Sequence, residues 1–379
     1  MPDSPADAWF RDQFQKHWRD AAEKVGRFNL AIFGKTGVGK STLINTVFGA
    51  EIAETGIGEP VTREEHLYLH DSGFLGLLDT RGLEIGIDTD QIITELGEYV
   101  ARMRRQPVKE QVHLAWYCVR ANDRRFEETE ASFIRKLHDL GLPVIVVMTQ
   151  VVKVGDNYHP DALALKWEIE ALDLPIFEGR VHLTMAKPDD FAGYPSHGLQ
   201  ELLDASFRGA PDAVGSALTA AQKIDMKRKR EHATAIISGA ATAAGAAGAT
   251  PIPFSDAVLL VPIQVGMMAG ISVVYGIEMD KAAIASVAAT ASATTLGRSA
   301  ATNLLKFIPG IGSVVGGTIN AAVASTFTLA MGTAWSVVCA QISQGRLTVV
   351  DTAAGSQEIR ELFLAELKRQ IARLDIRAR

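Results

Sequence analysis

Residues 34–41 read Gly-Lys-Thr-Gly-Val-Gly-Lys-Ser and match the pattern G-x-x-x-x-G-K-[ST]. Glycines in such a loop allow consecutive backbone N–H groups to turn toward one anion, and a helix that follows adds its positive N-terminal end. The lysine of this pattern reaches the outer phosphates of a nucleotide, and its last residue faces a Mg²⁺ ion. Because Lys40 and Ser41 occupy these positions, the sequence predicts a nucleotide phosphate site with bound magnesium.

The segments on either side support this prediction. Residues 28–33 form an apolar, strand-like run, and residues 41–48 have a helix-like pattern, which is the context that the motif requires. This context disfavours the alternative of a chance glycine-rich turn. The residues predicted to bind the nucleotide phosphates are Gly34, Lys35, Thr36, Gly37, Val38, Gly39, Lys40, Ser41 and Thr42.

A second motif follows downstream. The segment Asp79-Thr80-Arg81-Gly82 has the D-x-x-G spacing of a γ-phosphate sensor. Asp79 would hold Mg²⁺ through water, and the Gly82 amide would meet the γ-phosphate, so that the next loop orders only when that phosphate is present. Thr62, between the two motifs, is a candidate for a further ligand on the Mg²⁺ side. The predicted metal ligands are Ser41, Thr62 and Asp79, and the predicted catalytic residues are Lys40, Thr62 and Gly82.

The elements that must position these residues are those of an α/β protein. Helix-length polar stretches at 127–140 and 161–172 separate most of the strand-like runs, and this alternation predicts a mostly parallel sheet with helices on both faces. The turn Asp71-Ser72-Gly73 predicts one antiparallel hairpin, which we expect at a sheet edge. The strand-like runs are 28–33, 67–70, 74–78, 113–119, 142–148 and 180–183.

Length and composition set bounds on the class of protein. A chain of 379 residues exceeds the usual size of one compact core, so two domains are expected. A net charge of −6 and a pI near 5.9 disfavour a nucleic-acid-binding protein, because such proteins are usually basic over the contacting domain. The two cysteines, Cys118 and Cys339, are too few for a disulfide framework or a zinc site and suit a reducing compartment. The N-terminal stretch lacks the apolar core of a secretory signal, which predicts a cytoplasmic start.

The second half of the chain is dominated by uncharged stretches at 233–255, 257–277, 282–297 and 307–345. About 20 apolar residues span a bilayer core, but these stretches are rich in Ala, Gly, Ser and Thr, which favour close helix packing. Two alternatives stay open, a set of helices associated with the membrane and a soluble, alanine-rich bundle. Basic residues at 227–230 and after the last stretch favour a cytoplasmic side for both flanks.

Amphipathic helices are predicted at both ends of the chain. Each pattern is typical of a helix that docks on the chain's own body. A membrane-surface helix is the alternative at the N-terminus, and a coiled-coil interface is the alternative at the C-terminus. The apolar positions are Trp9, Phe10, Phe14 and Trp18 in the first helix, and Ile359, Phe363, Leu367, Ile371 and Leu374 in the last.

With these motifs in place, the chain resembles the Era-like GTPases related to translation factors. The resemblance rests on the phosphate loop, Pro60-Val61-Thr62, Asp79-Thr80-Arg81-Gly82 and the strand at 113–119. It implies a P-loop GTPase fold with a mostly parallel six-stranded sheet, GTP or GDP as ligand, and Mg²⁺.

The C-terminal half resembles a hydrophobic helical domain of unknown function that follows such GTPase domains in bacteria, through Pro251-Ile252-Pro253-Phe254-Ser255-Asp256-Ala257 and Ile308-Pro309-Gly310-Ile311-Gly312. It is distantly similar to the immunity-related GTPases, whose helices act at membranes. The predicted domains are an N-terminal helix at 1–26, the GTPase domain at 27–212, an all-α, Ala/Gly-rich helical domain at 213–350 and a C-terminal helix at 351–379.

Two departures from the family pattern concern base recognition and hydrolysis. Relatives recognise guanine with the motif Asn- or Thr-Lys-x-Asp, but this chain has Thr149-Gln150-Val151-Val152 at that place. The carboxylate that accepts hydrogen bonds from guanine is therefore missing, which puts the base preference in doubt, and Asp156 is the nearest candidate substitute. The resemblance places Thr149, Gln150, Ala186 and Lys187 at the base. Leu83 stands where some GTPases carry a water-orienting glutamine, which predicts slow intrinsic hydrolysis.

The sequence therefore predicts a slow GTPase switch that acts on a hydrophobic helical domain at the cytoplasmic membrane. The alternative is a nucleotide-binding scaffold that recruits partners with little or no hydrolysis. A ribosome-assembly role is disfavoured, because no basic RNA-binding domain is evident. Arg124 and Arg125 are candidate charge-stabilising fingers, with ordinary surface arginines as the alternative. The candidate partners are a guanine nucleotide, a membrane lipid, a second copy of the chain and an effector protein, and no nucleic acid is expected.

Overall fold

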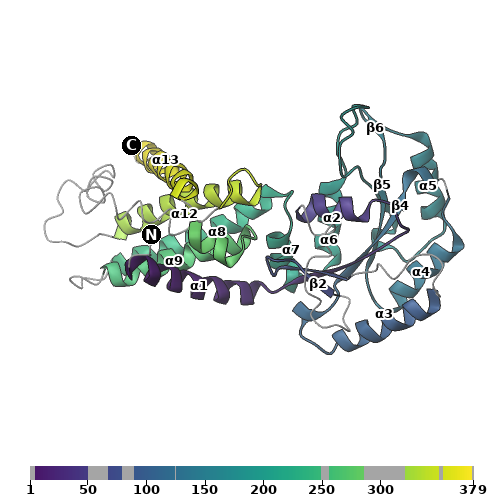
Figure 1. The fold of residues 1–379 in the computed structure, drawn as a ribbon, viewed down its shortest axis with the longest axis horizontal. Coiled ribbons are helices and arrows are strands. Elements are labelled where there is room, and N and C mark those ends of the chain that lie inside the picture. The colour runs from purple at the N-terminus through teal and green to yellow at the C-terminus, as the bar shows by residue number, and fades with distance from the viewer. Residues whose placement is uncertain are drawn as a thin grey trace. The chain divides into compact units, whose positions relative to one another are not determined.

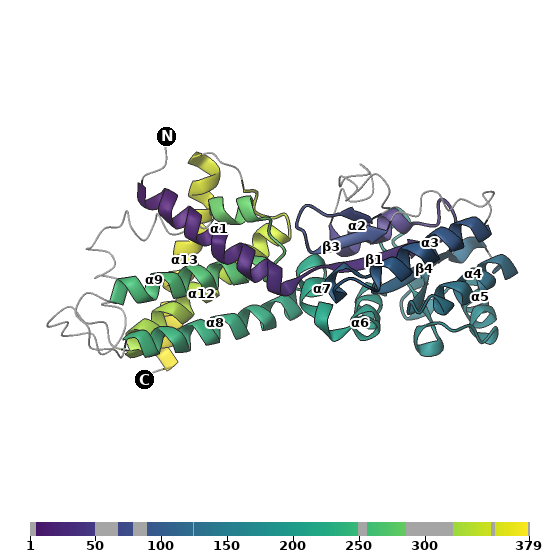
Figure 2. The ribbon, with the colours of Figure 1, turned by 90° about the horizontal axis from the view of Figure 1, so that it is seen from below.

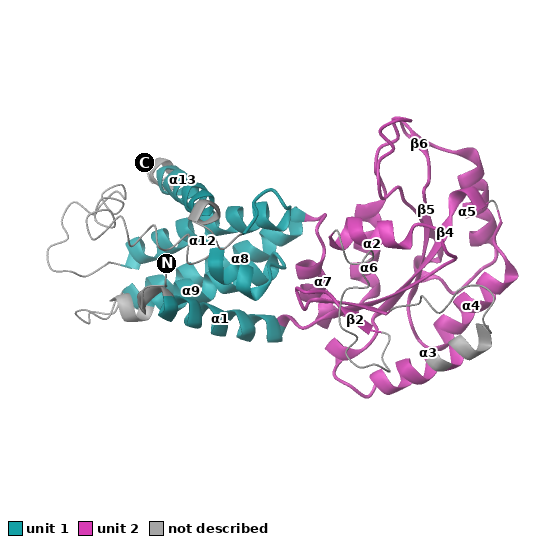
Figure 3. Ribbon diagram, viewed as in Figure 1, with its two compact units in different colours: residues 1–24, 226–379 teal, residues 25–225 magenta. Residues whose placement is uncertain are grey.

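The computed structural model of the chain describes residues 5–49, 67–78, 89–123, 125–248, 256–285, 321–349 and 353–377. It contains two compact units, coloured separately in Figure 3. One unit is Val25–Asp225, and the other combines Met1–Lys24 with Met226–Arg379. The second unit is therefore assembled from the two ends of the sequence.

A six-stranded sheet forms the centre of the unit Val25–Asp225 (Figure 1). Its strand order is β2-β3-β1-β4-β5-β8. Neighbouring strands are parallel except β2 and β3, which form an antiparallel hairpin at one edge. The predicted sheet and its edge hairpin are thus confirmed. The strands are β1 (Phe28–Phe33), β2 (Leu67–Leu69), β3 (Leu75–Leu78), β4 (Leu114–Arg120), β5 (Val144–Thr149) and β8 (Val181–Leu183). A separate small hairpin joins β6 (Lys153–Val154) to β7 (Asn157–Tyr158).

Helices cover both faces of this sheet, as adjacent residues of β4 show. Trp116 stacks on Phe48 with ring centroids 5.7 Å apart, and its indole N–H donates to the Ser206 hydroxyl at 3.0 Å. Tyr117 points to the opposite face, where its ring lies 6.0 Å from that of Phe133. One face carries α2 (Lys40–Phe48), α6 (Leu199–Gly209) and α7 (Gly215–Ala221), and the other carries α3 (Thr89–Met103), α4 (Glu128–Asp139) and α5 (Pro160–Ala171). Short 3₁₀ turns lie at Val108–Glu110, Ala121–Asp123, Phe177–Gly179 and Asp212–Val214.

The second unit is helical and packs around α12 (Figure 2). Gly332 of α12 allows the closest approach, since a Cβ atom there would lie 2.6 Å from the sulfur of Met267 and 2.8 Å from Ile237. Trp335 is fully buried one turn later, and its indole N–H donates to the Met268 carbonyl at 2.9 Å. The described helices of this unit include α1 (Pro5–Val25), α8 (Met226–Gly248), α9 (Asp256–Val274), α12 (Ala321–Ser343) and α13 (Ala353–Arg377).

Both terminal helices dock on this helical core, as the first of the two alternatives for each helix predicts. Phe14 of α1 is fully buried, and the indole of Trp18 donates to the Ile277 carbonyl at 3.2 Å. The apolar stripe of α13 enters the same core, where its described members are at most 3% exposed. These members are Ile359, Phe363, Leu367 and Ile371.

Among the described residues, α12 is the one helix long and apolar enough to cross a membrane, and 61% of its most apolar window is buried inside the protein. The core helix of a soluble protein passes the same test, so this finding leaves both alternatives for the helical unit open. The basic run at 227–230 is not one exposed patch. Lys229 is fully buried and donates to the Val274 carbonyl at 3.1 Å, whereas Lys227 and Arg230 are exposed.

Candidate functional site

The predicted phosphate loop connects the carboxyl end of β1 to the first turn of α2. Gly34 has a φ of +129°, and a Cβ atom there would lie 2.2 Å from the Cys118 carbonyl oxygen, so only glycine can occupy this position without distortion. Gly39 precedes the helix with a φ of +97°. Ser41 and Thr42 follow in the first turn of α2 and are exposed. N–H groups in a first turn have no intrahelical acceptor, so this end of α2 attracts an anion.

The side chain of Lys40 folds back across the loop. Its ammonium group donates to the carbonyls of Gly34 at 2.7 Å and Lys35 at 3.0 Å. These bonds connect the helix end of the loop to its strand end. They also hold a positive charge beside the first turn of α2, where the motif predicts a phosphate.

Thr149 ties the loop to the sheet from below. Its side chain is almost fully buried at the carboxyl end of β5, and its hydroxyl donates to the carbonyl of Val38 and lies 3.3 Å from that of Val119. The next residue, Gln150, is exposed with a left-handed φ of +55°. The side-chain amide nitrogen of Gln150 lies against the loop, 3.4 Å from the position that a Cβ atom would occupy at Gly39. Two of the predicted base-side residues are therefore adjacent to the phosphate loop.

The other predicted base-side segment follows β8. The amide of Val151 donates to the Thr184 carbonyl at 3.0 Å, which joins this segment to the end of β5. Ala186 is half-buried and Lys187 is exposed. His197, which the sequence did not single out, adds a further connection, because its Nε2 lies 2.9 Å from the Val151 carbonyl oxygen.

Asp156, the candidate substitute for the base-reading carboxylate, lies in the turn between β6 and β7. Its side chain is fully exposed, and its carboxylate lies 3.7 Å from the ammonium group of Lys153. The amide of His159 donates to the Val152 carbonyl at 3.0 Å, which closes this hairpin onto the segment after β5. The structure therefore puts Asp156 in an exposed hairpin turn.

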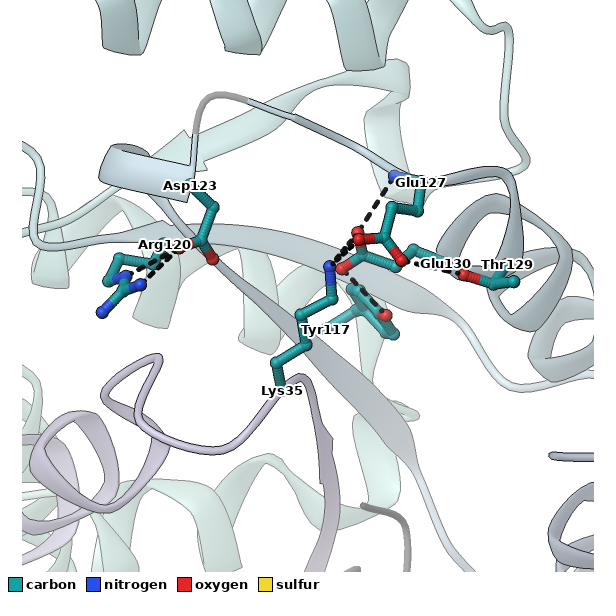
Figure 4. Close-up of polar contacts among 7 residues, drawn as sticks. All are labelled: Lys35, Tyr117, Arg120, Asp123, Glu127, Thr129 and Glu130. Carbon is teal, nitrogen blue, oxygen red and sulfur yellow. Dashed lines mark hydrogen bonds and ion pairs between the residues drawn. The ribbon is translucent and has the colours of Figure 1, made fainter. Parts of the chain in front are cut away.

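Two carboxylates at the start of α4 contact the phosphate loop, which the sequence did not predict (Figure 4). The Lys35 ammonium group lies 2.8 Å from Glu127 and 3.2 Å from Glu130. Partial burial acts to lower the pKa of Lys35, but the hydrogen bonds and charges of the two carboxylates raise it overall. The same contacts hold the pKa of Glu127 below its usual range. Glu127 and Glu130 also form a reciprocal capping box at the start of α4, and an acidic residue followed three positions later by Glu was the available sequence signal.

Several predicted residues lie outside the described part of the chain. These are Thr62, Asp79, Gly82, Leu83 and Arg124. Ser41 is thus the one predicted metal ligand that the structure describes, and Arg125 is exposed. Within the described ranges, no group of three or more His, Cys, Asp or Glu side chains could hold a metal ion.

Comparison with known families matches residues 29–150 to the family described as "50S ribosome-binding GTPase". The matched segment begins in β1, contains the phosphate loop and ends at Gln150. Together with the observed sheet, this match gives the unit Val25–Asp225 the P-loop GTPase fold, and this part of the chain is a P-loop GTPase domain.

Individual relatives are similar at low identity. "GTPase Era" of Ruminiclostridium cellulolyticum is 29% identical over a segment that covers 32% of this chain and 39% of that protein. "Cell division control protein 10" of Saccharomyces cerevisiae is 24% identical, covering 32% of this chain and 47% of that protein. The chain thus spans less than half the length of these relatives. The solved structure of "a probable GTP-binding protein engB" is 16% identical with a TM-score of 0.33, and covers 48% of this chain and 97% of that one.

Proposed function

We propose that this chain hydrolyses GTP to GDP and phosphate, and that its nucleotide state controls the helical unit at the cytoplasmic membrane. The observation that carries the nucleotide part is the built phosphate loop. Lys40 is held across it by two carbonyls, Thr149 anchors it from below, and the first turn of α2 presents its N–H groups. The GTPase family match over residues 29–150 supports guanine nucleotide as the ligand.

The loop residues account for the binding step. The ammonium group of Lys40 and the first-turn amides of α2 neutralise and orient the β- and γ-phosphates. Ser41 offers an exposed hydroxyl beside Lys40, and a hard oxygen ligand suits Mg²⁺, so Ser41 would hold the metal together with Thr62 and Asp79. Bound Mg²⁺ would neutralise charge that develops on the phosphate oxygens. The Gly82 amide would report the presence of the γ-phosphate to the segment that follows.

Hydrolysis in this proposal is slow. Leu83 follows the D-x-x-G glycine, and an aliphatic side chain cannot orient an attacking water. The same residue favours the second candidate function, a scaffold in which bound nucleotide stabilises the fold and the helices recruit a partner. Phosphate release in single-turnover reactions separates the two functions, since the scaffold releases little or no phosphate.

The decisive experiment titrates fluorescent GTP, GDP and ATP into the full chain and then follows phosphate release. Lys40→Ala should abolish binding and leave the fold intact, because it removes the cation that faces the phosphates without opening the core. Lys281→Ala is the matched control, since this exposed lysine pairs with Glu278 in the helical unit. Unchanged GTP affinity in Lys40→Ala would contradict the proposed site.

The membrane part of the proposal rests on the helical unit. The sequence of α8 has no charge from residue 233 to its end, and its exposed positions there are Ala, Gly, Ser and Thr. The helix α12 is long and apolar enough to span a bilayer. Exposed basic side chains at Lys227 and Arg230 precede this uncharged surface and would contact anionic headgroups.

A further inference from the structure

The carboxylates of Glu127 and Glu130 lie at the edge of a loop that is built to bind an anion. Glu127 is half-exposed, whereas the side chain of Glu130 is only 6% exposed. Glu130 accepts hydrogen bonds from the Tyr117 hydroxyl at 3.3 Å and from the Glu127 amide at 3.0 Å, which fix it at this position (Figure 4). Two carboxylates near bound phosphates would weaken binding, and the buried one is screened little by salt.

Lys35 is the cation that opposes this pair. Its side chain contacts both carboxylates, and its own backbone carbonyl accepts a hydrogen bond from the Lys40 ammonium group at 3.0 Å. The two lysines therefore act at one short loop. In the proposed site, Lys40 contacts the phosphates, whereas Lys35 contacts the carboxylates of Glu127 and Glu130. The raised pKa of Lys35 keeps it charged throughout the neutral range.

We propose that Lys35 is a positioning residue that neutralises Glu127 and Glu130, so that the phosphate loop accepts an anionic nucleotide, and GTP more than GDP. This inference rests on the proposed function of the loop. The preference for GTP follows from charge, since the γ-phosphate adds negative charge to the ligand and so gains more from the neutralised pair.

A purely mechanical role makes a different prediction. If Lys35 only held the loop against α4, a variant that lacks both Lys35 and one of the carboxylates would bind nucleotide no better than a variant that lacks Lys35 alone. If Lys35 neutralises repulsion, removing a carboxylate from the Lys35 variant should restore binding. The sign of the second substitution therefore separates the two roles.

The experiment measures Kd for fluorescent GTP and GDP with the full chain. Lys35→Met should weaken GTP binding by about tenfold and GDP binding by about threefold. Lys35→Met combined with Glu127→Gln or with Glu130→Gln should recover most of this loss, and Lys35→Arg should keep wild-type affinity. The matched control combines Lys35→Met with Glu128→Gln, because Glu128 is one residue away but pairs with Arg135 at 2.7 Å. This control should recover much less.

Circular dichroism and thermal unfolding of each variant confirm that it folds, and Lys35→Arg provides a test even if Lys35→Met does not. The inference is overturned if the double variants bind no better than Lys35→Met, if Glu128→Gln recovers as much as Glu127→Gln, or if Lys35→Arg loses affinity. A wild-type chain that binds no nucleotide would instead overturn the proposed function. A wild-type chain that binds, with double variants that do not recover, would overturn only the role of Lys35.

Discussion

Replacing Thr149 with valine tests how the phosphate loop is anchored. Valine keeps the branched shape of threonine at a position that is only 4% exposed, so the neighbouring side chains keep most of their contacts. The change removes the hydroxyl that donates to the Val38 carbonyl. Because Val38 is itself buried, water cannot readily replace the lost donor.

The expected magnitude follows from this buried carbonyl. Leaving a buried acceptor without its donor costs about 1–3 kcal/mol. If the loop relieves that cost by moving away from β5, nucleotide binding must restore the anchored arrangement, and the same free energy appears in the affinity. We therefore expect Kd to rise by about 5- to 150-fold. GTP and GDP should be affected equally, since the anchor supports the loop as a whole.

The assay is a titration of fluorescent GTP and GDP, together with denaturant unfolding. Thr219→Val is the matched control, because Thr219 is also a buried residue and its hydroxyl donates to the Gly215 carbonyl at 2.9 Å within α7. Both variants should lose some stability toward denaturant, but only Thr149→Val should lose affinity. An unchanged Kd in Thr149→Val, or an equal loss in the control, would refute the anchoring role.

Two further predictions concern the recognition of the nucleotide base and the stability of the protein at low pH. Gln150→Lys combined with Val152→Asp should sharpen discrimination of GTP from ATP in competition titrations, and a wild-type chain that already rejects ATP by several orders of magnitude would show that another residue reads the base. Burial lowers the pKa of His113 and lowers that of His182 to about 4, so below pH 6.5 the unfolded chain binds protons that the folded chain does not. The contribution of His182 to the free energy of unfolding should be fully present above about pH 6.5, and up to about 3 kcal/mol of it should be lost as the pH drops toward 4. Denaturant midpoints of His182→Asn that fall with pH as steeply as those of the wild type would contradict this.

The sheet could be predicted because its strands are nearly continuous apolar runs, which is typical of parallel strands buried on both faces. All six residues of β5 are buried, for example. The hairpin of β6 and β7 has only two residues in each strand, which is too short for a periodic signal. The helices α3, α6 and α7 were not predicted, although α3 and α6 have clear amphipathic patterns.

The candidate site divides in the same way between local and long-range information. The phosphate loop is contiguous in sequence, so its residue types and spacing suffice to identify it. The support of the loop is not contiguous. Thr149 lies 111 residues from Val38, and Glu127 lies 92 residues from Lys35. Only the fold brings these pairs together, so the sequence predicted the loop but not the contacts that Thr149 and Glu127 make with it.

The helical unit shows why composition alone left two alternatives. Small residues favour close packing both in a membrane and in a soluble core. Gly332 allows α12 to pack closely against α8 and α9, because side chains of these two helices occupy the space that a Cβ atom would need. Trp335 and the apolar stripe of α13 fill the same core. The helix with the strongest membrane signal is therefore also a central packing element of its unit.

This packing shapes the membrane prediction. Lys229 is buried against the Val274 carbonyl, so the electrostatic attraction to anionic lipid is left to the exposed Lys227 and Arg230, at about 1 kcal/mol for each residue. We expect the full chain to co-sediment with anionic vesicles. High salt should release only part of it, since salt screens these charges but not apolar contacts.

Lys227→Glu combined with Arg230→Glu should remove the salt-sensitive part of the binding and leave the salt-resistant part. Lys166→Glu is the control, because Lys166 lies in α5 of the GTPase unit. A full chain that purifies without detergent as a monodisperse species and ignores vesicles would show that α8, α9 and α12 form a closed bundle. The helical unit would then act on a protein partner, because helices that stay packed against one another in a closed bundle do not insert into a bilayer.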